Sequence, residues 1–169
     1  MLTYDGVHPT PLGNQMIADQ MADGILASYP VGSAFDAWVG PSAGGKGLTG
    51  EAAAFDADPD GDGLPNGIEF VIGGEPNPAN PGSNSRALLP TAVASGNDLV
   101  FTYTRTHAAA YLNPVVEFDA DLQGMWTTAT AGNATIQVTP GATADTVTVT
   151  IPREATQQLF ARLKVVATP

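Results

Sequence analysis

The sequence predicts a mainly β protein of the α+β class, in which an antiparallel β-sandwich or small barrel of about six strands follows an N-terminal helix. Two observations predict the strands. From Asp98 onward apolar residues alternate with polar ones, and Thr and Val dominate the alternating segments. Gly, Asn and Pro separate these segments at intervals of roughly 10–15 residues, as expected for turns between short strands.

Composition restricts the classes of function open to the chain. Hydrophobic residues make up 43% of its 169 residues, enough for a packed core, and the net charge is -11. Nucleic acid and anionic membrane surfaces are poor partners for such a chain because both are negative, whereas cations are favoured. The absence of cysteine excludes disulfides, thiolate zinc sites and thiol nucleophiles. No apolar run is long enough to span a membrane, and residues 1–6 have neither the basic nor the apolar region of a signal peptide.

The first predicted element is a helix over residues 11–27. Thr10 is a suitable N-cap, and Pro11 suits the first helical position. Behind them apolar residues recur at helical spacing, which gives one apolar stripe that must pack on another surface. The stripe consists of Leu12, Met16, Ile17, Met21, Ile25 and Leu26.

Residues 31–90 are predicted to be mostly linker, because Gly, Ser and Pro are frequent before Gly50 and again after Glu75. Two short helices are expected within this linker. Residues 34–39 suffice for one or two helical turns, and residues 65–72 are predicted to form a helix that Gly73 and Gly74 end.

The remaining residues, 91–169, are predicted to form the β-sandwich. Gly96-Asn97-Asp98 is expected to be a turn before the first strand. The predicted strands cover residues 99–104, 115–118, 125–128, 135–138, 146–151 and 160–166.

The most specific motif lies ahead of the strands. Residues 58–69 read Asp-Pro-Asp-Gly-Asp-Gly-Leu-Pro-Asn-Gly-Ile-Glu and match the spacing D-x-[DN]-x-[DN]-G-x5-E at every defined position. Calcium takes six to eight oxygen ligands, and carboxylates at positions one, three and five converge on the ion when such a loop curls. Gly63 permits the sharp turn at position six, and Pro65 suits the start of the following helix. The predicted ligands are the side chains of Asp58, Asp60, Asp62, Asn66 and Glu69 and the carbonyl oxygen of Leu64.

The sequence thus predicts Ca2+ as a cofactor, bound in an EF-hand-like loop with one short helix. The loop resembles the single calcium loops of dockerins and of thrombospondin type 3 repeats. Dockerins carry two such loops and one is found here, which argues against cohesin binding. Asp56 extends the pattern upstream, as an outer-shell or alternative ligand. The alternative interpretation is an acidic turn that stays solvated, since Asp and Gly are common turn residues.

A second motif, Asp5-Gly6-Val7-His8-Pro9 followed by the predicted helix, resembles the last block of SGNH (GDSL-type) hydrolases over about residues 4–28. The resemblance implies that His8 is the general base for a serine far upstream and that Asp5 orients its imidazole. It also makes residues 1–30 the remnant of a hydrolase C-terminus. The Gly-Asp-Ser nucleophile block is missing from the chain as given, so we expect no catalytic activity from this chain by itself. An ordinary turn is the alternative interpretation of these residues.

Four further motifs occur in the rest of the chain: Phe35-Asp36-Ala37-Trp38, the acidic loop with Asn66–Phe70 and Gly73-Gly74, Glu117–Leu122 with Trp126, and Phe160-Ala161-Arg162-Leu163. With these motifs, residues 33–167 resemble a module found at the C-terminus of large exported proteins of Planctomycetes and Verrucomicrobia. Asp119 replaces the serine usual in the third motif. The resemblance implies an exported accessory domain, placed outside the cell or on its surface.

Three functions are predicted from these observations. The first is a calcium-binding, noncatalytic module at the C-terminus of an exported SGNH-type esterase. The second is a carbohydrate-binding module that anchors the parent enzyme to polysaccharide through Trp126 and Tyr111, although Trp126 is better explained as a core residue. The third is part of an active ester hydrolase whose nucleophile lies in a missing segment.

Overall fold

A computed structural model of the chain describes residues 34–153 and 158–166. Residues Ala34–Pro169 form one compact unit, distinct from Met1–Ser33. The predicted helix over residues 11–27 and the motif with Asp5 and His8 lie outside the described residues. Among the described residues, no helix has the length and apolar character needed to cross a membrane.

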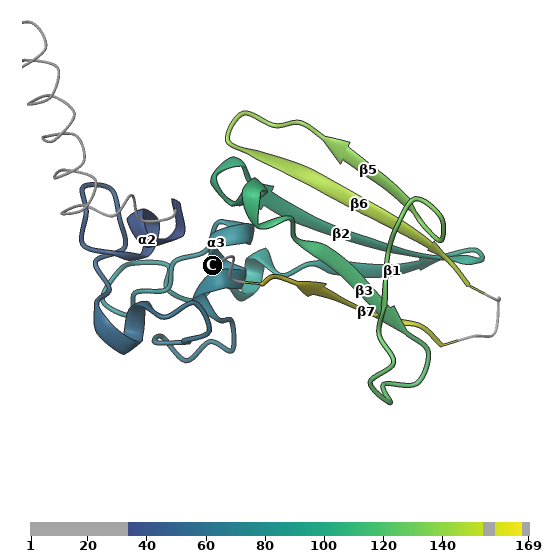
Figure 1. The fold of residues 1–169 in the computed structure, drawn as a ribbon, viewed down its shortest axis with the longest axis horizontal. Helices are drawn as coiled ribbons and strands as arrows, with labels where there is room; N and C mark the ends of the chain where they lie inside the picture. Colours follow the sequence, from purple (N-terminus) through teal and green to yellow (C-terminus); the bar gives the residue numbers. More distant parts are fainter. Residues whose placement is uncertain (1–33, 154–157, 167–169) are drawn as a thin grey trace, which may run out of the picture. The chain divides into compact units, whose positions relative to one another are not determined.

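The described part of the chain is mainly β, as predicted, with two antiparallel sheets and a few short helices (Figure 1). One sheet has the strand order β1-β2-β6-β5 and the other the order β4-β3-β7, an arrangement consistent with a β-sandwich. The strands are β1 (Thr91–Ser95), β2 (Asp98–Thr106), β3 (Val115–Asp119), β4 (Thr127–Thr128), β5 (Thr135–Thr139), β6 (Ala144–Pro152) and β7 (Phe160–Lys164).

Each of the six predicted strands overlaps a strand of the structure, and β1 is an addition. All five residues of β1 are exposed, so the strand has no alternation of buried and exposed positions. β1 pairs with β2 through a two-residue turn, Gly96-Asn97, in which Gly96 has a φ of 59°. The turn predicted before Leu99 is therefore confirmed, and it joins a hairpin that the strand pattern alone did not predict.

The core of the larger sheet lies on one face of β2 and β6. Both strands alternate buried and partly exposed residues, and their antiparallel register places apolar side chains opposite one another. The opposing pairs are Leu99 with Ile151, Phe101 with Val149, and Tyr103 with Val147.

Within the described residues, two short α-helices precede the sheets in the sequence, α2 (Ala34–Val39) and α3 (Asn66–Ile72). Both match predicted helices, although α3 begins after Pro65, which has an extended ψ of 148° and acts as the N-cap. Gly73 ends α3 in a left-handed conformation, as predicted, with a φ of 84°. The three further short helices are 3-10 helices: η1 (Gly50–Ala53), η2 (Ser85–Leu88) and η3 (His107–Leu112).

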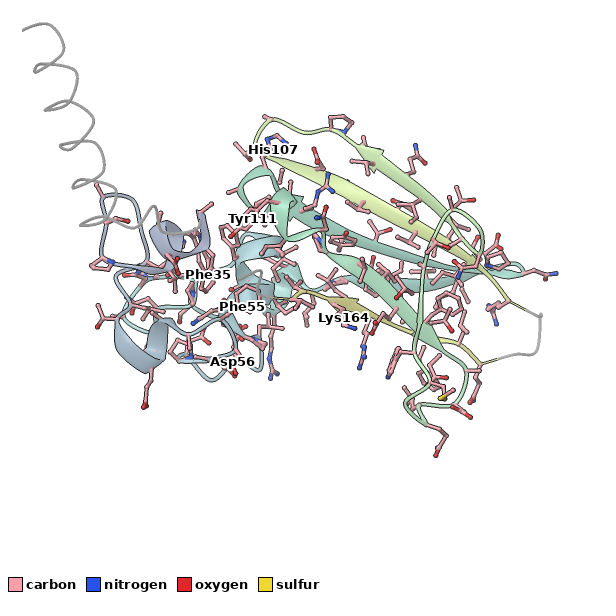
Figure 2. The ribbon with its side chains drawn as sticks, viewed as in Figure 1. Phe35, Phe55, Asp56, His107, Tyr111 and Lys164 are labelled. Atoms are coloured by element: carbon pink, nitrogen blue, oxygen red, sulfur yellow. The ribbon has the colours of Figure 1, made fainter. Side chains whose placement is uncertain are left out.

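Aromatic side chains fix α3 in place. The Phe70 ring lies 5.6 Å from that of Phe35 and 5.2 Å from that of Trp38. The Phe35 and Phe55 side chains lie near each other (Figure 2), and their ring centroids are 4.9 Å apart. Thr106 of β2 donates a hydrogen bond of 2.8 Å to the carbonyl oxygen of Phe70. Phe35 and Phe70 belong to the same hydrophobic core as the strands, and Trp38 and Phe55 pack against it, so α3 is a rigid support for the acidic loop that precedes it.

Candidate metal centre

The loop between Asp58 and α3 is curled by hydrogen bonds from its own backbone. The carboxylate of Asp58 accepts the N–H of Gly61 at 3.0 Å through one oxygen and that of Gly63 at 2.9 Å through the other. Gly61 and Gly63 have φ values of 72° and 90°, in the region that favours glycine. The predicted sharp turn at Gly63 is therefore present.

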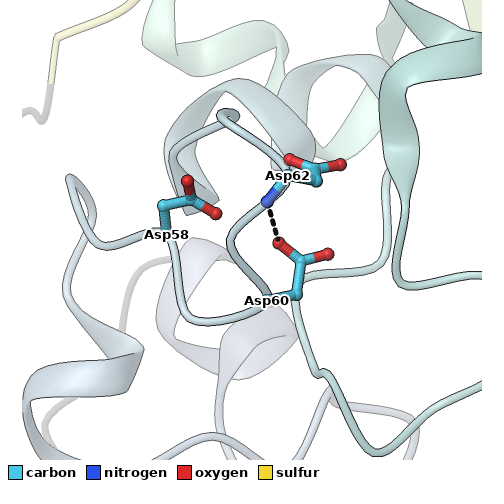
Figure 3. Close-up of side chains that lie close together, drawn as sticks. All are labelled: Asp58, Asp60 and Asp62. Carbon is cyan, nitrogen blue, oxygen red and sulfur yellow. Dashed lines mark hydrogen bonds between the residues drawn. The ribbon is translucent and has the colours of Figure 1, made fainter.

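This curl brings the first three predicted ligands together (Figure 3). One carboxylate oxygen each from Asp58, Asp60 and Asp62 lies within 4.8 Å of the other two. Asp58 is exposed, Asp60 is half-buried, and Asp62 is only 6% exposed. The Asp62 N–H donates to the carboxylate of Asp60 at 3.2 Å.

Glu69, at position twelve of the motif, is fully buried in the first turns of α3. One of its carboxylate oxygens, Oε1, accepts a hydrogen bond of 2.7 Å from the Ser85 hydroxyl. The other, Oε2, is buried and has no hydrogen-bond partner among the described residues, and the same is true of Asp60 Oδ2. A buried carboxylate oxygen without a donor or a cation is costly, so these two atoms point to a ligand.

The pKa values of these groups reflect the same crowding. Burial raises the pKa of Glu69 from 4.5 to about 7; the Ser85 hydrogen bond lowers it in part, and the charges of Asp60, Asp62 and Asp58 raise it further. Burial likewise raises the pKa of Asp60. The hydrogen bond from the Asp62 N–H lowers this pKa in part, and the charges of Asp62 and Asp58 raise it further. A bound cation would lower the pKa values of both groups, because it favours the ionised carboxylates.

The two other predicted ligands are also placed by the structure. The Asn66 side chain is buried, and its NH2 group donates to the carbonyl oxygens of Ala52 at 2.8 Å and Ala54 at 2.7 Å. Asn66 thereby fastens the segment before the loop to α3, while its Oδ1 has no partner among the described residues. Leu64 packs its side chain in the core and donates its N–H to Asp62 at 2.9 Å, and its carbonyl oxygen stays a predicted ligand.

Two residues of the site were not predicted from the sequence, Ser85 and Arg86. The Ser85 N–H donates to Asp62 Oδ2 at 2.6 Å, and the Arg86 guanidinium donates through Nε to the Asp62 carbonyl oxygen. The sequence gives only a weak signal here. The Asn84 side chain accepts the Arg86 N–H at 3.2 Å and so caps η2. An Asn at this place indicates a turn, but it does not indicate that the turn contacts a loop more than 20 residues away.

The predicted carbohydrate-binding aromatics are engaged within the protein. The guanidinium carbon of Arg162 lies 4.0 Å from the centroid of the Trp126 ring and so covers one of its faces. The Tyr111 side chain lies near Phe35 (Figure 2), and its hydroxyl accepts the Phe35 N–H at 3.3 Å. The Tyr111 ring is 6.4 Å from that of Phe70. Trp126 is half-buried and Tyr111 is 40% exposed.

The donor set fits a hard divalent cation. Three aspartate carboxylates converge from a glycine-bent loop, and Glu69 in the following helix is close enough for their charges to raise its pKa. Cysteine is absent from the chain. Calcium and magnesium prefer such oxygen ligands, whereas zinc and copper sites usually include imidazole or thiolate. Comparison of the chain with protein-family models, with curated proteins and with solved structures found no match.

Proposed function

We propose that this chain is a calcium-binding, noncatalytic module, in which Asp58, Asp60, Asp62 and Glu69 hold one calcium ion. The observation that carries the proposal is the pair of buried, unpartnered oxygens, Asp60 Oδ2 and Glu69 Oε2, beside the converging aspartates. The carbonyl of Leu64 and the Oδ1 of Asn66 are further ligands in this proposal. Their order along the chain follows the calcium-loop spacing.

In this proposal the ion stabilises the fold rather than taking part in chemistry. Asp62 of the loop and Glu69 of α3 both accept hydrogen bonds from Ser85, which lies in the segment that leads into β1, so the site joins three parts of the chain. An ion that binds only the folded chain stabilises it by mass action. Sites in extracellular modules commonly have dissociation constants of about 10⁻⁴–10⁻³ M, which suits a calcium-rich medium.

The proposal includes a parent protein, an exported SGNH-type esterase with this module at its C-terminus. Its support is the resemblance of Asp5, His8 and Pro9 to the last hydrolase block, together with the module-like motifs of residues 33–167. The placement outside the cell rests on the same resemblance. Hydrolysis of p-nitrophenyl acetate by the 169-residue chain tests whether the chain by itself is noncatalytic. We expect no rate above that of a His8→Ala variant.

The stabilising role is tested by thermal unfolding with calcium and with a chelator. At a hundredfold excess over the dissociation constant, calcium should raise the melting temperature by roughly 5–10 °C. Asp60→Asn should abolish most of this rise. Asp56→Asn is the matched control, because it removes the same charge from an exposed residue outside the cluster and should leave the rise intact. An equal response of both variants would contradict the assignment.

A further inference from the structure

The segment that begins 3-10 helix η2 closes the buried side of the acidic loop. Ser85 is only 2% exposed, although α3 and an irregular stretch of chain separate it from the loop in the sequence. Its N–H donates to Asp62 Oδ2 at 2.6 Å and its hydroxyl donates to Glu69 Oε1 at 2.7 Å. One serine therefore joins the carboxylates at positions five and twelve of the motif.

The backbone around this serine leaves it little freedom. The Ser85 hydroxyl oxygen also accepts the N–H of Glu75 at 2.9 Å, so its hydrogen is directed to Glu69. A Cβ atom at Gly74 would lie 2.6 Å from Ser85 Oγ and 2.8 Å from Glu69 Oε1, which shows how closely the chain wraps the pair. The hydrogen bond between Ser85 and Glu69 is therefore fixed by the surrounding backbone.

This bond makes the two oxygens of Glu69 unequal. Oε1 is held by the serine, whereas Oε2 is buried and has no partner among the described residues. Calcium accepts six to eight oxygens and often takes both oxygens of the last glutamate, whereas magnesium requires six in a near-octahedral arrangement. A glutamate that offers one oxygen lowers the coordination number and weakens the preference for calcium.

We propose that Ser85 determines the selectivity of the metal site: by holding Glu69 Oε1 it limits Glu69 to one oxygen, so that the site accepts magnesium as well as calcium. This inference rests on the proposed metal-binding function and names a positioning residue for that site. Ser85 does not touch the ion in this arrangement. It acts through Glu69 and, with its N–H, through Asp62.

The test compares the calcium and magnesium affinities of the full chain with those of Ser85→Ala, by calorimetric titration of each metal alone. Removal of a residue that orients a ligand usually costs roughly ten- to a hundredfold in affinity. The affinity for magnesium should fall by this full factor. Calcium should lose less, because the freed Oε1 becomes a seventh ligand, and the ratio of calcium to magnesium affinity should rise by about tenfold or more.

Arg86→Ala is the matched control, because it removes the bond from the same segment to the Asp62 carbonyl and leaves Glu69 untouched. It should leave the affinity ratio unchanged. An equal loss of both metals in Ser85→Ala would overturn the inference and assign Ser85 a purely structural role. If the wild-type chain binds neither metal, the proposed function itself fails.

A second measurement needs no variant and decides the question if Ser85→Ala does not fold. In a crystal structure of the wild-type chain with calcium bound, one Glu69 oxygen should lie within about 2.6 Å of the ion, and Oε1 should stay bonded to Ser85. Coordination by both Glu69 oxygens would overturn the inference while leaving the calcium site intact.

Discussion

Two glutamates in the described part of the chain are buried, Glu69 and Glu117, and their surroundings differ in charge. Glu117 on β3 accepts two hydrogen bonds from Arg162, at 3.0 and 2.7 Å, and one from Lys164 at 2.8 Å, both on β7. Glu69 has a serine hydroxyl on one oxygen and no partner among the described residues on the other. Its charged neighbours are the three aspartates of the loop.

The two pKa values move in opposite directions. Hydrogen bonds from Lys164 and Arg162 lower the pKa of Glu117 despite its burial. Burial and the neighbouring aspartates raise the pKa of Glu69 to about 7. The comparison teaches that burying a carboxylate requires a counter-charge, which the chain supplies at Glu117 and which, in our proposal, the solution supplies at Glu69.

The largest effect is expected from removing the counter-charge at Glu117. Arg162→Met combined with Lys164→Met leaves a buried carboxylate unpaired and should cost about 3 kcal/mol of unfolding free energy. Calcium should not restore this loss, because the pair is not part of the loop. Calorimetric unfolding measures it, and adding Glu117→Gln to the double variant should recover part of the stability. No loss in the double variant would contradict the role given to this ion pair.

Glu69→Gln should have the opposite effect in the presence of a chelator. The neutral amide avoids the cost of an ionised group among three aspartates, so the metal-free chain should gain on the order of 2 kcal/mol at about pH 8. Glu117→Gln should instead lower stability at the same pH. Urea unfolding of the two variants measures both changes, and a loss of stability in metal-free Glu69→Gln would show that Glu69 is already compensated within the chain.

The pH dependence of the metal-free chain should follow from the raised pKa of Glu69. Because this pKa rises from 4.5 to about 7 on folding, the folded chain holds the proton more tightly than the unfolded chain. Glu69 should therefore lower stability progressively as the pH rises from about 4.5 to about 7. Glu117, with a lowered pKa, should contribute stability above its usual pKa of 4.5 and lose it as the pH falls through its lowered value.

Urea midpoints in chelator isolate the Glu69 contribution when wild type is compared with Glu69→Gln. The difference between their urea midpoints should widen from about pH 5 to about pH 8, and it should disappear when calcium is added. A gap that is constant over this range would contradict the raised pKa.

The smallest effect is expected at Trp126. Its ring lies against the Arg162 guanidinium that pairs with Glu117, and Trp126→Ala should cost about 1 kcal/mol through this contact and lost packing. The calcium response should be unchanged, as measured by the melting temperature with and without the metal. A strengthened or abolished calcium response would show that the two regions are coupled.

Sequence periodicity predicted the strands whose residues alternate between apolar and polar. β2 and β6 were predicted in this way, and so was β5, although all five of its residues are exposed. β1, whose sequence is Thr-Ala-Val-Ala-Ser, has no such alternation to detect. Its existence follows from the turn at Gly96 and from pairing with β2, which is a tertiary property.

The acidic loop was predictable because its chemistry is local. Asp58, Asp60 and Asp62 converge through turns that their own glycines permit, so spacing alone describes them. Ser85 was not predictable, because only the folded chain brings it to Asp62 and Glu69. The partners of Glu117 likewise come from a strand that is distant in sequence.

Calorimetric titration of the full chain with calcium tests the central claim most directly, that the counter-charge of Glu69 is an ion from solution. We predict uptake of about one ion per chain by wild type and by Asp56→Asn, and none by Asp60→Asn combined with Glu69→Gln. Absence of uptake by wild type in millimolar calcium, or equal uptake by the double variant, would contradict it.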